Sequence, residues 1–173
     1  MGNKEICLSR ETIAQRVRDL GEEIDRDYPG GSLLVVGVLT GAFIFTADLV
    51  RAVSVPLEVD FIRLASYGTG TSPGELRLTK DIETEVRGRD LLLVEDIVDT
   101  GRTLAWLVEF LAKKEPKSIK ICALIDKRER REKEIRIDYP GFTVEQGFLV
   151  GYGLDYAGRD RHLPGIYRMK STP

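Results

Sequence analysis

The stretch LLLVEDIVDTGRTL, residues 91–104, restricts the possible folds of this chain more than any other part of the sequence. Four apolar residues at 91–94 predict a strand that is buried on both faces. Two adjacent carboxylates follow, Glu95 and Asp96, and then a loop of small residues. This order predicts an open α/β sheet with a ligand at the carboxyl end of the strand. The helix that follows is predicted from apolar side chains at helical spacing, Leu104, Trp106, Leu107, Phe110 and Leu111.

The loop at residues 99–103, DTGRT, has the residue types of a phosphate site. Its backbone N–H groups can surround a phosphate at the helix N-terminus, where the helix dipole favours an anion. Glu95 and Asp96 beside that phosphate suit sugar hydroxyls, with or without Mg²⁺. Asp99 lies at the same crevice and is a candidate base. Together these features predict a site for ribose 5-phosphate.

Three other interpretations fit this stretch less well. A strand ending in Glu-Asp also occurs in P-loop ATPases, but the chain contains no G-x-x-x-x-G-K-[ST] motif. Asp-Thr-Gly also occurs in aspartic proteases, where a β context is expected, whereas a helical pattern follows here. In the plainest structural interpretation the polar residues only cap the helix, with Asp99 or Thr100 as the N-cap. Capping does not explain three carboxylates at one strand end, because they repel one another unless something binds there.

The composition restricts the class and the location of the protein. A length of 173 residues suits a single domain, 1–173, with a sizeable core. Hydrophobic residues make up 42% and the formal net charge is −2, which is typical of a globular protein without a bulk charge for nucleic acid. No apolar run approaches the length of a membrane span, and the opening residues do not resemble a signal peptide. Cys7 and Cys122 have no metal or redox spacing, so a cytoplasmic protein is expected.

The rest of the chain predicts alternating helices and strands. Helical stripes predict a first helix at residues 9–28, with Ser9 as its N-cap, and a second that begins near Phe43. The run of charges at residues 128–133 is expected to be a solvated face. Strands are expected at residues 33–39, 57–64, 76–79 and 118–125, a strand-rich segment at 142–153, and a glycine-rich loop at 65–74.

Residues 91–103 closely resemble the PRPP-binding signature of type I phosphoribosyltransferases. The form VEDIVDTGRT is most similar to that of the hypoxanthine/guanine phosphoribosyltransferases, and the resemblance extends over about residues 5–170. It implies the type I phosphoribosyltransferase fold, an α/β fold with a mostly parallel central sheet flanked by helices. The core would cover about residues 30–140. A small hood would come from the N-terminal segment and about residues 141–173.

The resemblance assigns roles to the acidic pair and to the loop that follows it. Glu95 and Asp96 would contact the ribose 2- and 3-hydroxyls with Mg²⁺ alongside, and Asp155 would be a third metal ligand. Asp99 would lie near the purine N7 and would accept or return its proton, which makes it the candidate catalytic residue. The 5-phosphate would be bound mainly by backbone N–H groups of Thr100, Gly101, Arg102 and Thr103.

A second short loop, VLTGA, resembles the loop that binds pyrophosphate in the family. The resemblance implies a non-proline cis peptide between Leu39 and Thr40, and it assigns pyrophosphate binding to Leu39, Thr40, Gly41 and Arg161. Many relatives carry Lys or Arg where this chain has Thr40. The backbone contacts remain possible, but a side-chain charge is missing.

The motif Ser66-Tyr67-Gly68 resembles the mobile loop of the family, which closes over the active site during the reaction. Closure would exclude water from an oxocarbenium-like ribose. A segment rich in glycine and polar residues suits such a motion.

The resemblance also implies how the base would be recognised. Lys127 matches the lysine that donates a hydrogen bond to the purine 6-oxo group, which favours hypoxanthine or guanine over adenine. Phe148 would stack on the purine and the backbone of Leu149 would meet its edge. Asp155, in the GYGLDY motif, belongs to the same group of implied purine-site residues.

The function implied by the resemblance is purine salvage. The 5-phosphoribosyl group of PRPP would be transferred to hypoxanthine or guanine, giving IMP or GMP and pyrophosphate, with Mg²⁺ as the cofactor. The expected partners are these small molecules and further copies of the chain, in a homodimer or homotetramer, without nucleic acid or membrane. Two alternatives stay open. One is a xanthine-preferring phosphoribosyltransferase, since Lys127 suits any 6-oxopurine. The other is a non-catalytic regulator that binds PRPP or nucleotides, against which the balanced charge argues.

Overall fold

The structure is a computed structural model that describes residues 4–67 and 75–170. The larger of its two sheets has six strands in the order β4-β3-β2-β5-β6-β7. The edge strand β4 runs antiparallel to β3, and the other pairs are parallel. These strands are β2 (Leu33–Leu39), β3 (Leu57–Tyr67), β4 (Glu75–Lys80), β5 (Asp90–Val98), β6 (Ser118–Lys127) and β7 (Tyr139–Val144).

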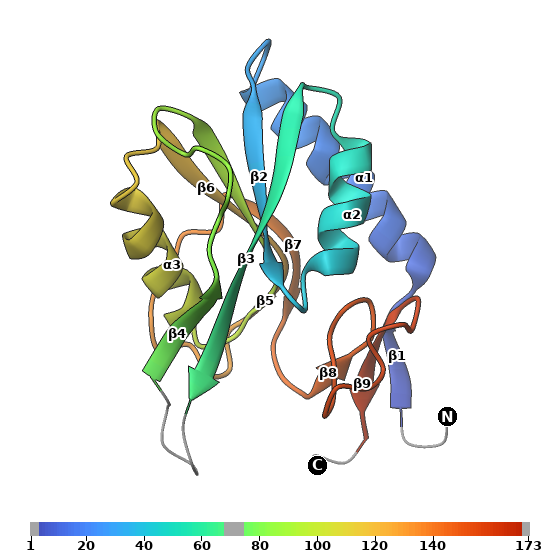
Figure 1. Cartoon of the computed structure of the whole chain (residues 1–173). Helices are drawn as coiled ribbons and strands as arrows, with labels where there is room; N and C mark the ends of the chain where they lie inside the picture. The colour runs from blue at the N-terminus through green and yellow to red at the C-terminus, as the bar shows by residue number, and fades with distance from the viewer. Residues whose placement is uncertain (1–3, 68–74, 171–173) are drawn as a thin grey trace.

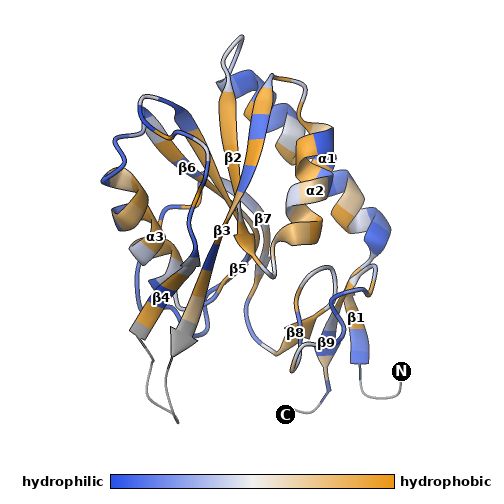
Figure 2. Ribbon diagram, viewed as in Figure 1, coloured by the Kyte–Doolittle hydropathy of each residue, from blue (hydrophilic) through white to orange (hydrophobic). Residues whose placement is uncertain are grey.

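Helices cover both faces of this sheet (Figure 1). Helices α1 (Arg10–Asp27) and α2 (Phe43–Ala52) pack against one face, and α3 (Arg102–Ala112) packs against the other. In β2 the side chain of Val35 joins the core beneath α1 and α2, whereas Val36 joins the core beneath α3. The central strands are therefore apolar on both faces, as Figure 2 shows, which is why the sequence contains short uninterrupted apolar runs.

The smaller sheet joins the two ends of the described chain in the order β1-β9-β8 (Figure 1). Its strands are β1 (Lys4–Leu8), β8 (Leu149–Val150) and β9 (Ile166–Met169), and both pairs are antiparallel. It lies below the carboxyl ends of the parallel strands and corresponds to the predicted hood. Because β7 belongs to the larger sheet and ends at Val144, that sheet extends a few residues beyond the boundary expected near residue 140.

The first helix confirms the sequence prediction within a residue at each end. Helix α1 starts at Arg10, and the hydroxyl of Ser9 accepts a hydrogen bond from the Thr12 N–H at 3.1 Å. Ser9 is therefore the N-cap, as predicted. The helix ends at Asp27, one turn before the glycines at 30 and 31.

Three strands extend beyond their predicted carboxyl ends by two residues or more, and β4 extends by one residue at each end. Strand β5 continues from the predicted end at residue 94 to Val98, because Ile97 and Val98 pair with Ile125 and Asp126 of β6. Strand β6 continues to Lys127, and β3 continues through residues 66 and 67, which the sequence placed in a loop. The last residue of the predicted mobile motif Ser66-Tyr67-Gly68 lies outside the described residues, so its closure stays a prediction.

Candidate active site

A cavity of about 330 Å³ opens at the carboxyl ends of β2 and β5. Parallel strands deliver their carboxyl ends to the same edge of a sheet, and the loop into α3 closes one side of that edge. Of the predicted site residues, the cavity brings together Leu39, Gly41, Glu95, Asp96, Asp99, Thr100, Gly101 and Thr103. The predicted residues that do not line it are Thr40, Arg102, Lys127, Phe148, Leu149, Asp155 and Arg161.

Two adjacent carboxylates, Glu95 and Asp96, lie at this edge inside β5 and not after it. They are 7% and 8% exposed, and neither forms an ion pair with another described residue. Burial and the charge of Asp96 raise the pKa of Glu95 well above its ordinary value, and burial raises the pKa of Asp96. A divalent cation or hydroxyl donors would relieve this repulsion, so the pair suits both.

The described residues contain no group of three or more His, Cys, Asp or Glu side chains arranged to hold a metal ion. The structure thus does not bring Asp155 into one group with Glu95 and Asp96. The carboxylate of Asp155 instead pairs with Arg161 at 2.6 Å and accepts the Gly158 N–H at 2.7 Å. The pair that remains still fits Mg²⁺, which proteins commonly bind through one or two carboxylates while the substrate supplies other oxygens.

The loop after β2 lies against both the acidic pair and the hood. The peptide bond between Leu39 and Thr40 is cis, as predicted. A Cβ at Gly41 would lie 1.9 Å from the Oδ2 of Asp96, so any side chain at this position would have to displace that buried carboxylate. On its other side, a Cβ at Gly153 would lie 2.1 Å from the Gly41 carbonyl oxygen. Arg161 donates to the Gly153 carbonyl at 2.6 Å, which ties together two parts of the hood segment that lies against this loop.

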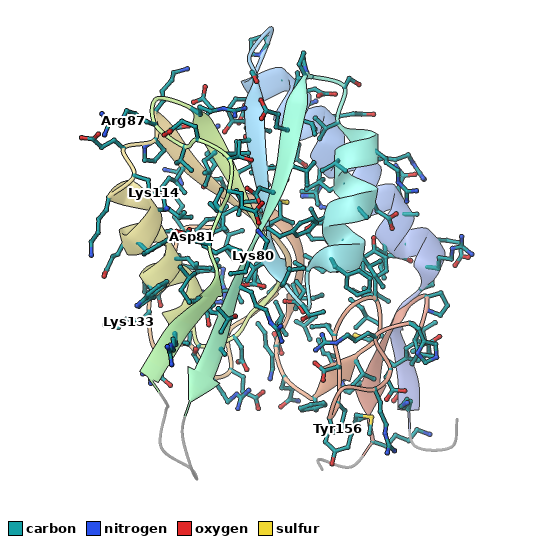
Figure 3. All side chains as sticks on the ribbon, in the orientation of Figure 1. Lys80, Asp81, Arg87, Lys114, Lys133 and Tyr156 are labelled. Carbon is teal, nitrogen blue, oxygen red and sulfur yellow. The ribbon has the colours of Figure 1, made fainter. Side chains whose placement is uncertain are left out.

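The loop into α3 does not use the predicted cap. Gly101 occupies the N-cap position with φ 79° and has no side chain that could cap the helix. Neither Asp99 nor Thr100 is therefore the N-cap residue, although the Thr100 hydroxyl accepts a hydrogen bond from the Arg102 N–H at 3.3 Å. The backbone turns in the left-handed region, where glycine is favoured. A Cβ at Gly101 would also lie 2.2 Å from the Lys133 carbonyl, and Figure 3 shows Lys133 beside this end of α3.

Asp99 faces charged groups of opposite sign, unlike the pair before it. Its Oδ2 pairs with Arg130, while its Oδ1 is buried and has no hydrogen-bond partner among the described residues. The Nζ of Lys127 lies 3.9 Å from that Oδ1 and 3.0 Å from the Oε2 of Glu129. Lys127 is the last residue of β6 and is only 6% exposed. A buried acceptor and a buried donor thus lie side by side at neighbouring strand ends.

The charged run after β6 is a solvated face, as the sequence predicted, except at Arg131. The side chain of Arg130 pairs with Asp99, and the side chain of Arg131 is 10% exposed and bonds to atoms of both β5 and β6. Both arginines were missed because a run of charges gives no sign of a distant partner. The signal that the sequence did contain is their position, within four residues of Lys127 at the end of a buried strand.

Phe148 and Leu149 lie in the hood and do not line the cavity. The ring of Phe148 meets Tyr156 edge-on, with 5.7 Å between the ring centroids, and Figure 3 shows Tyr156 at the outer side of the hood. The carbonyl of Phe148 accepts the Met169 N–H, and Leu149 pairs with Arg168 in the hood sheet. Their contact with a purine stays a prediction.

Comparisons with known proteins agree with this geometry. The family model described as phosphoribosyl transferase domain matches residues 6–157. The hypoxanthine-guanine phosphoribosyltransferase of Bacillus subtilis (strain 168) is 45% identical over 168 residues, which are 96% of this chain and 93% of that protein. The chain is 46% identical over 168 residues to the bifunctional protein TilS/HprT of Listeria monocytogenes, of which it spans 26%.

Among solved structures, the hypoxanthine phosphoribosyltransferase of Trypanosoma cruzi in complex with the product IMP superposes with a TM-score of 0.89 at 37% identity. The match covers 95% of this chain and 92% of that one. The chain belongs to the phosphoribosyltransferase family, and its fold is the type I phosphoribosyltransferase fold that the sequence predicted. Within the family, the relatives named above are hypoxanthine or hypoxanthine-guanine phosphoribosyltransferases, which confirms the resemblance seen in residues 91–103.

None of the described helices has the length and apolar character needed to cross a membrane.

Proposed function

We propose that this chain transfers the 5-phosphoribosyl group of PRPP to N9 of hypoxanthine or guanine, producing IMP or GMP and pyrophosphate. The observation that carries the proposal is the buried Lys127 beside the unpartnered Oδ1 of Asp99, next to the cavity that holds the acidic pair. A 6-oxopurine offers an acceptor at O6 and a donor at N7–H, which complements this donor and acceptor. The relatives that act on hypoxanthine support the choice of base.

The ribose and its 5-phosphate would occupy the cavity at the end of β5. The N–H groups at the start of α3 lack partners within the helix, and that of Arg102 donates to the Thr100 hydroxyl at 3.3 Å. Residues 100–103 could donate to a phosphate that replaces this partner, with the helix dipole in support. Glu95 and Asp96 would accept hydrogen bonds from the two ribose hydroxyls. The same two carboxylates would hold Mg²⁺, which when bound offsets the charge that develops on the leaving pyrophosphate.

The O6 and N7 edge of the base would face Lys127 and Asp99, which lie side by side with 3.9 Å between Nζ and Oδ1. Lys127 donates to O6 and orients the ring, and Asp99 accepts the N7 proton as N9 bonds to C1 of the ribose and the bond from C1 to the pyrophosphate oxygen breaks. In the reverse direction the same carboxyl returns the proton. Stacking on Phe148 and contact with the Leu149 backbone complete the proposed base site. Most of the rate enhancement would come from positioning and from electrostatic stabilisation of the transition state.

Pyrophosphate would leave along the loop after β2. The backbone of Leu39, Thr40 and Gly41 would bind it, and Arg161 would add a positive charge. In the unliganded chain Arg161 pairs with Asp155 at 2.6 Å, so pyrophosphate would compete with Asp155 for this arginine. Closure of the motif at residues 66–68, a homodimeric or homotetrameric assembly and a cytoplasmic location stay predictions from the sequence.

The direct test is a panel of bases offered with PRPP and Mg²⁺, followed by release of pyrophosphate. The panel contains hypoxanthine, guanine, xanthine, adenine, orotate and uracil. Turnover with hypoxanthine or guanine but not with adenine is the expected result. Turnover with xanthine alone would favour the xanthine alternative, and turnover only with adenine or a pyrimidine would overturn the role of Lys127. Binding of PRPP without any turnover would favour the regulatory alternative.

A further inference from the structure

The side chain of Arg131 spans the gap between the ends of β5 and β6. Toward β5 its Nη2 donates to the Val98 carbonyl at 3.0 Å, and its Nε donates to the Asp99 carbonyl at 3.1 Å. Toward β6 its Nη2 lies 2.5 Å from the Oδ1 of Asp126 and 3.2 Å from the Lys127 carbonyl. One guanidinium therefore contacts the backbone of both proposed base-recognition residues.

The surroundings of Arg131 show that this contact is built into the core of the site. Its side chain is 10% exposed, and its counter-ion Asp126 is also buried. Leaving either charge without the other in such a place is costly, so the two hold each other in position. The pair lies behind the residues that face the substrate, since neither Arg131 nor Asp126 lines the cavity at the end of β5.

The same segment is tied separately to the phosphate loop. The N–H groups of Glu132 and Lys133 both donate to the Thr100 carbonyl, at 3.0 and 2.9 Å. These backbone bonds do not involve the guanidinium of Arg131. A change confined to that side chain therefore acts first on Asp99 and Lys127, and leaves the anchorage of the phosphate loop in place.

We propose that Arg131 is a positioning residue that sets the separation between Asp99 and Lys127, and with it how well this acceptor and donor match N7–H and O6 of the 6-oxopurine. This proposal rests on the proposed function of those two residues. The guanidinium is planar and its donors have a fixed geometry, so it can hold carbonyls of two strands at once. A lysine ammonium at the same position is a compact charge on a flexible stem and cannot fix both strand ends in the same way.

The test is the variant Arg131→Lys, which keeps the charge and removes the planar bridge. A misplacement of about 1 Å in a reacting group can cost about 10²-fold in rate, so we expect kcat/KM for hypoxanthine to fall by about that factor. The dissociation constant of Mg–PRPP, measured by titration calorimetry, should change less than about twofold, because the phosphate loop keeps its own anchors. If Arg131 contributed to stability alone, the variant would lose hypoxanthine use and Mg–PRPP affinity by similar factors.

The matched control is Arg128→Lys. Arg128 lies on the same segment and donates to the other oxygen of Asp126 at 3.1 Å, but it is exposed and touches one strand only. Its kinetics should match those of the unaltered chain. If Arg131→Lys does not fold, Asp126→Asn takes its place, because it loosens only the β6 side of the bridge. The expected result for that variant is a raised KM for hypoxanthine with an unchanged Mg–PRPP affinity.

Unaltered kcat and KM for hypoxanthine in a folded Arg131→Lys variant would overturn the proposal, as would equal losses in hypoxanthine use and in Mg–PRPP affinity. If Asp126→Asn is the variant used, unaltered kinetics would have the same meaning. Failure of the unaltered chain to use any 6-oxopurine would instead overturn the proposed function, so the two failures are distinguishable.

Discussion

Two groups of carboxylates at the candidate active site differ in how their charge is balanced. At the acidic pair, Glu95 and Asp96 are buried next to each other without an ion-paired cation, and the pKa of each is raised. At the start of the loop into α3, Asp99 has Arg130 on one oxygen and Lys127 near the other. Two residues of sequence, Ile97 and Val98, separate the unneutralised pair of carboxylates from this neutralised carboxylate.

The difference indicates which group of side chains needs a ligand to balance its charge. A buried pair of like charges is costly to keep, and the cost is offset when a cation or hydroxyl donors arrive. Opposite charges that already face each other are preorganised, and a ligand has only to present a matching acceptor and donor to them. Asp60, elsewhere in the molecule, shows a third way in which the charge of a buried carboxylate is stabilised. Burial opposes ionisation there, but backbone N–H groups of Thr84, Phe61 and Glu83 outweigh it and lower the pKa of Asp60 to about 2.

The largest expected effect follows from substitution of Asp99, the carboxylate that already has cationic partners. Asp99→Asn removes the group that accepts the N7 proton, so kcat should fall by about 10²-fold, the lower end of what a positioned acid or base contributes. Steady-state turnover with hypoxanthine at saturating PRPP measures this. The affinity for Mg–PRPP should stay largely intact, since the acidic pair is unaltered. Unchanged turnover at saturating substrates would remove Asp99 from the acid–base role.

The next effect concerns Lys127. Lys127→Ala leaves the purine O6 without its charged donor, and a hydrogen bond to a charged group contributes about 1.5–3 kcal/mol, or roughly 10- to 150-fold in kcat/KM for hypoxanthine. Lys133→Ala is the control, because Lys133 is an exposed lysine of the same segment. Equal kcat/KM values for the two variants would show that Lys127 does not recognise the base.

A third effect tests the cost of the acidic pair. The folded-state pKa of Glu95 lies above its ordinary value of 4.5, so its buried charge destabilises the fold only as the pH rises above that value. Glu95→Gln should therefore stabilise the chain at pH 7.5 by about 0.5–2 kcal/mol, the usual range of a stabilising substitution, and have little effect below about pH 4. Urea unfolding at both pH values measures this difference. A variant that is less stable at pH 7.5 would contradict the account of the pair.

The smallest effect concerns Glu129, whose Oε2 lies 3.0 Å from the Nζ of Lys127. The purine O6 would compete with this partner for the ammonium. The Glu129 side of this ion pair is exposed to solvent, which limits its contribution to about 1 kcal/mol, so Glu129→Gln should lower KM for hypoxanthine by about two- to fivefold. Glu134→Gln, an exposed glutamate on the same segment, is the control and should leave KM unchanged. A raised KM in Glu129→Gln would mean that Glu129 supports the lysine instead of competing for it.

Much of the fold and of the phosphate side of the site was predictable because its signals are local. The apolar run before Glu95, the glycine at 101 and the cap at Ser9 each act within a few residues of themselves. The cis peptide after Leu39 was predicted from resemblance alone and is confirmed.

What the sequence did not predict depends on distant partners. The true end of β5 at Val98 is set by its register with β6, which no property of β5 itself reveals. The side chain of Arg131 is largely buried because four acceptors at two strand ends converge on it. Its neighbours in the sequence are charged, and such a run predicts exposure to solvent. The hood was expected from the resemblance alone, because its sheet pairs residues as distant in sequence as Lys4 and Met169, which periodicity cannot specify.

The central claim is that the acidic pair binds the ribose and that Lys127 binds the purine. The most direct test compares the affinity for Mg–PRPP of two variants, Asp96→Asn and Lys127→Ala, by titration calorimetry. Loss of a contact to a charged group predicts an affinity reduced about tenfold or more in Asp96→Asn. Lys127→Ala should bind Mg–PRPP within about twofold of the unaltered chain, because its partner is the base. Equal losses in the two variants, or a larger loss in Lys127→Ala, would contradict the assignment of the acidic pair to the ribose and of Lys127 to the purine.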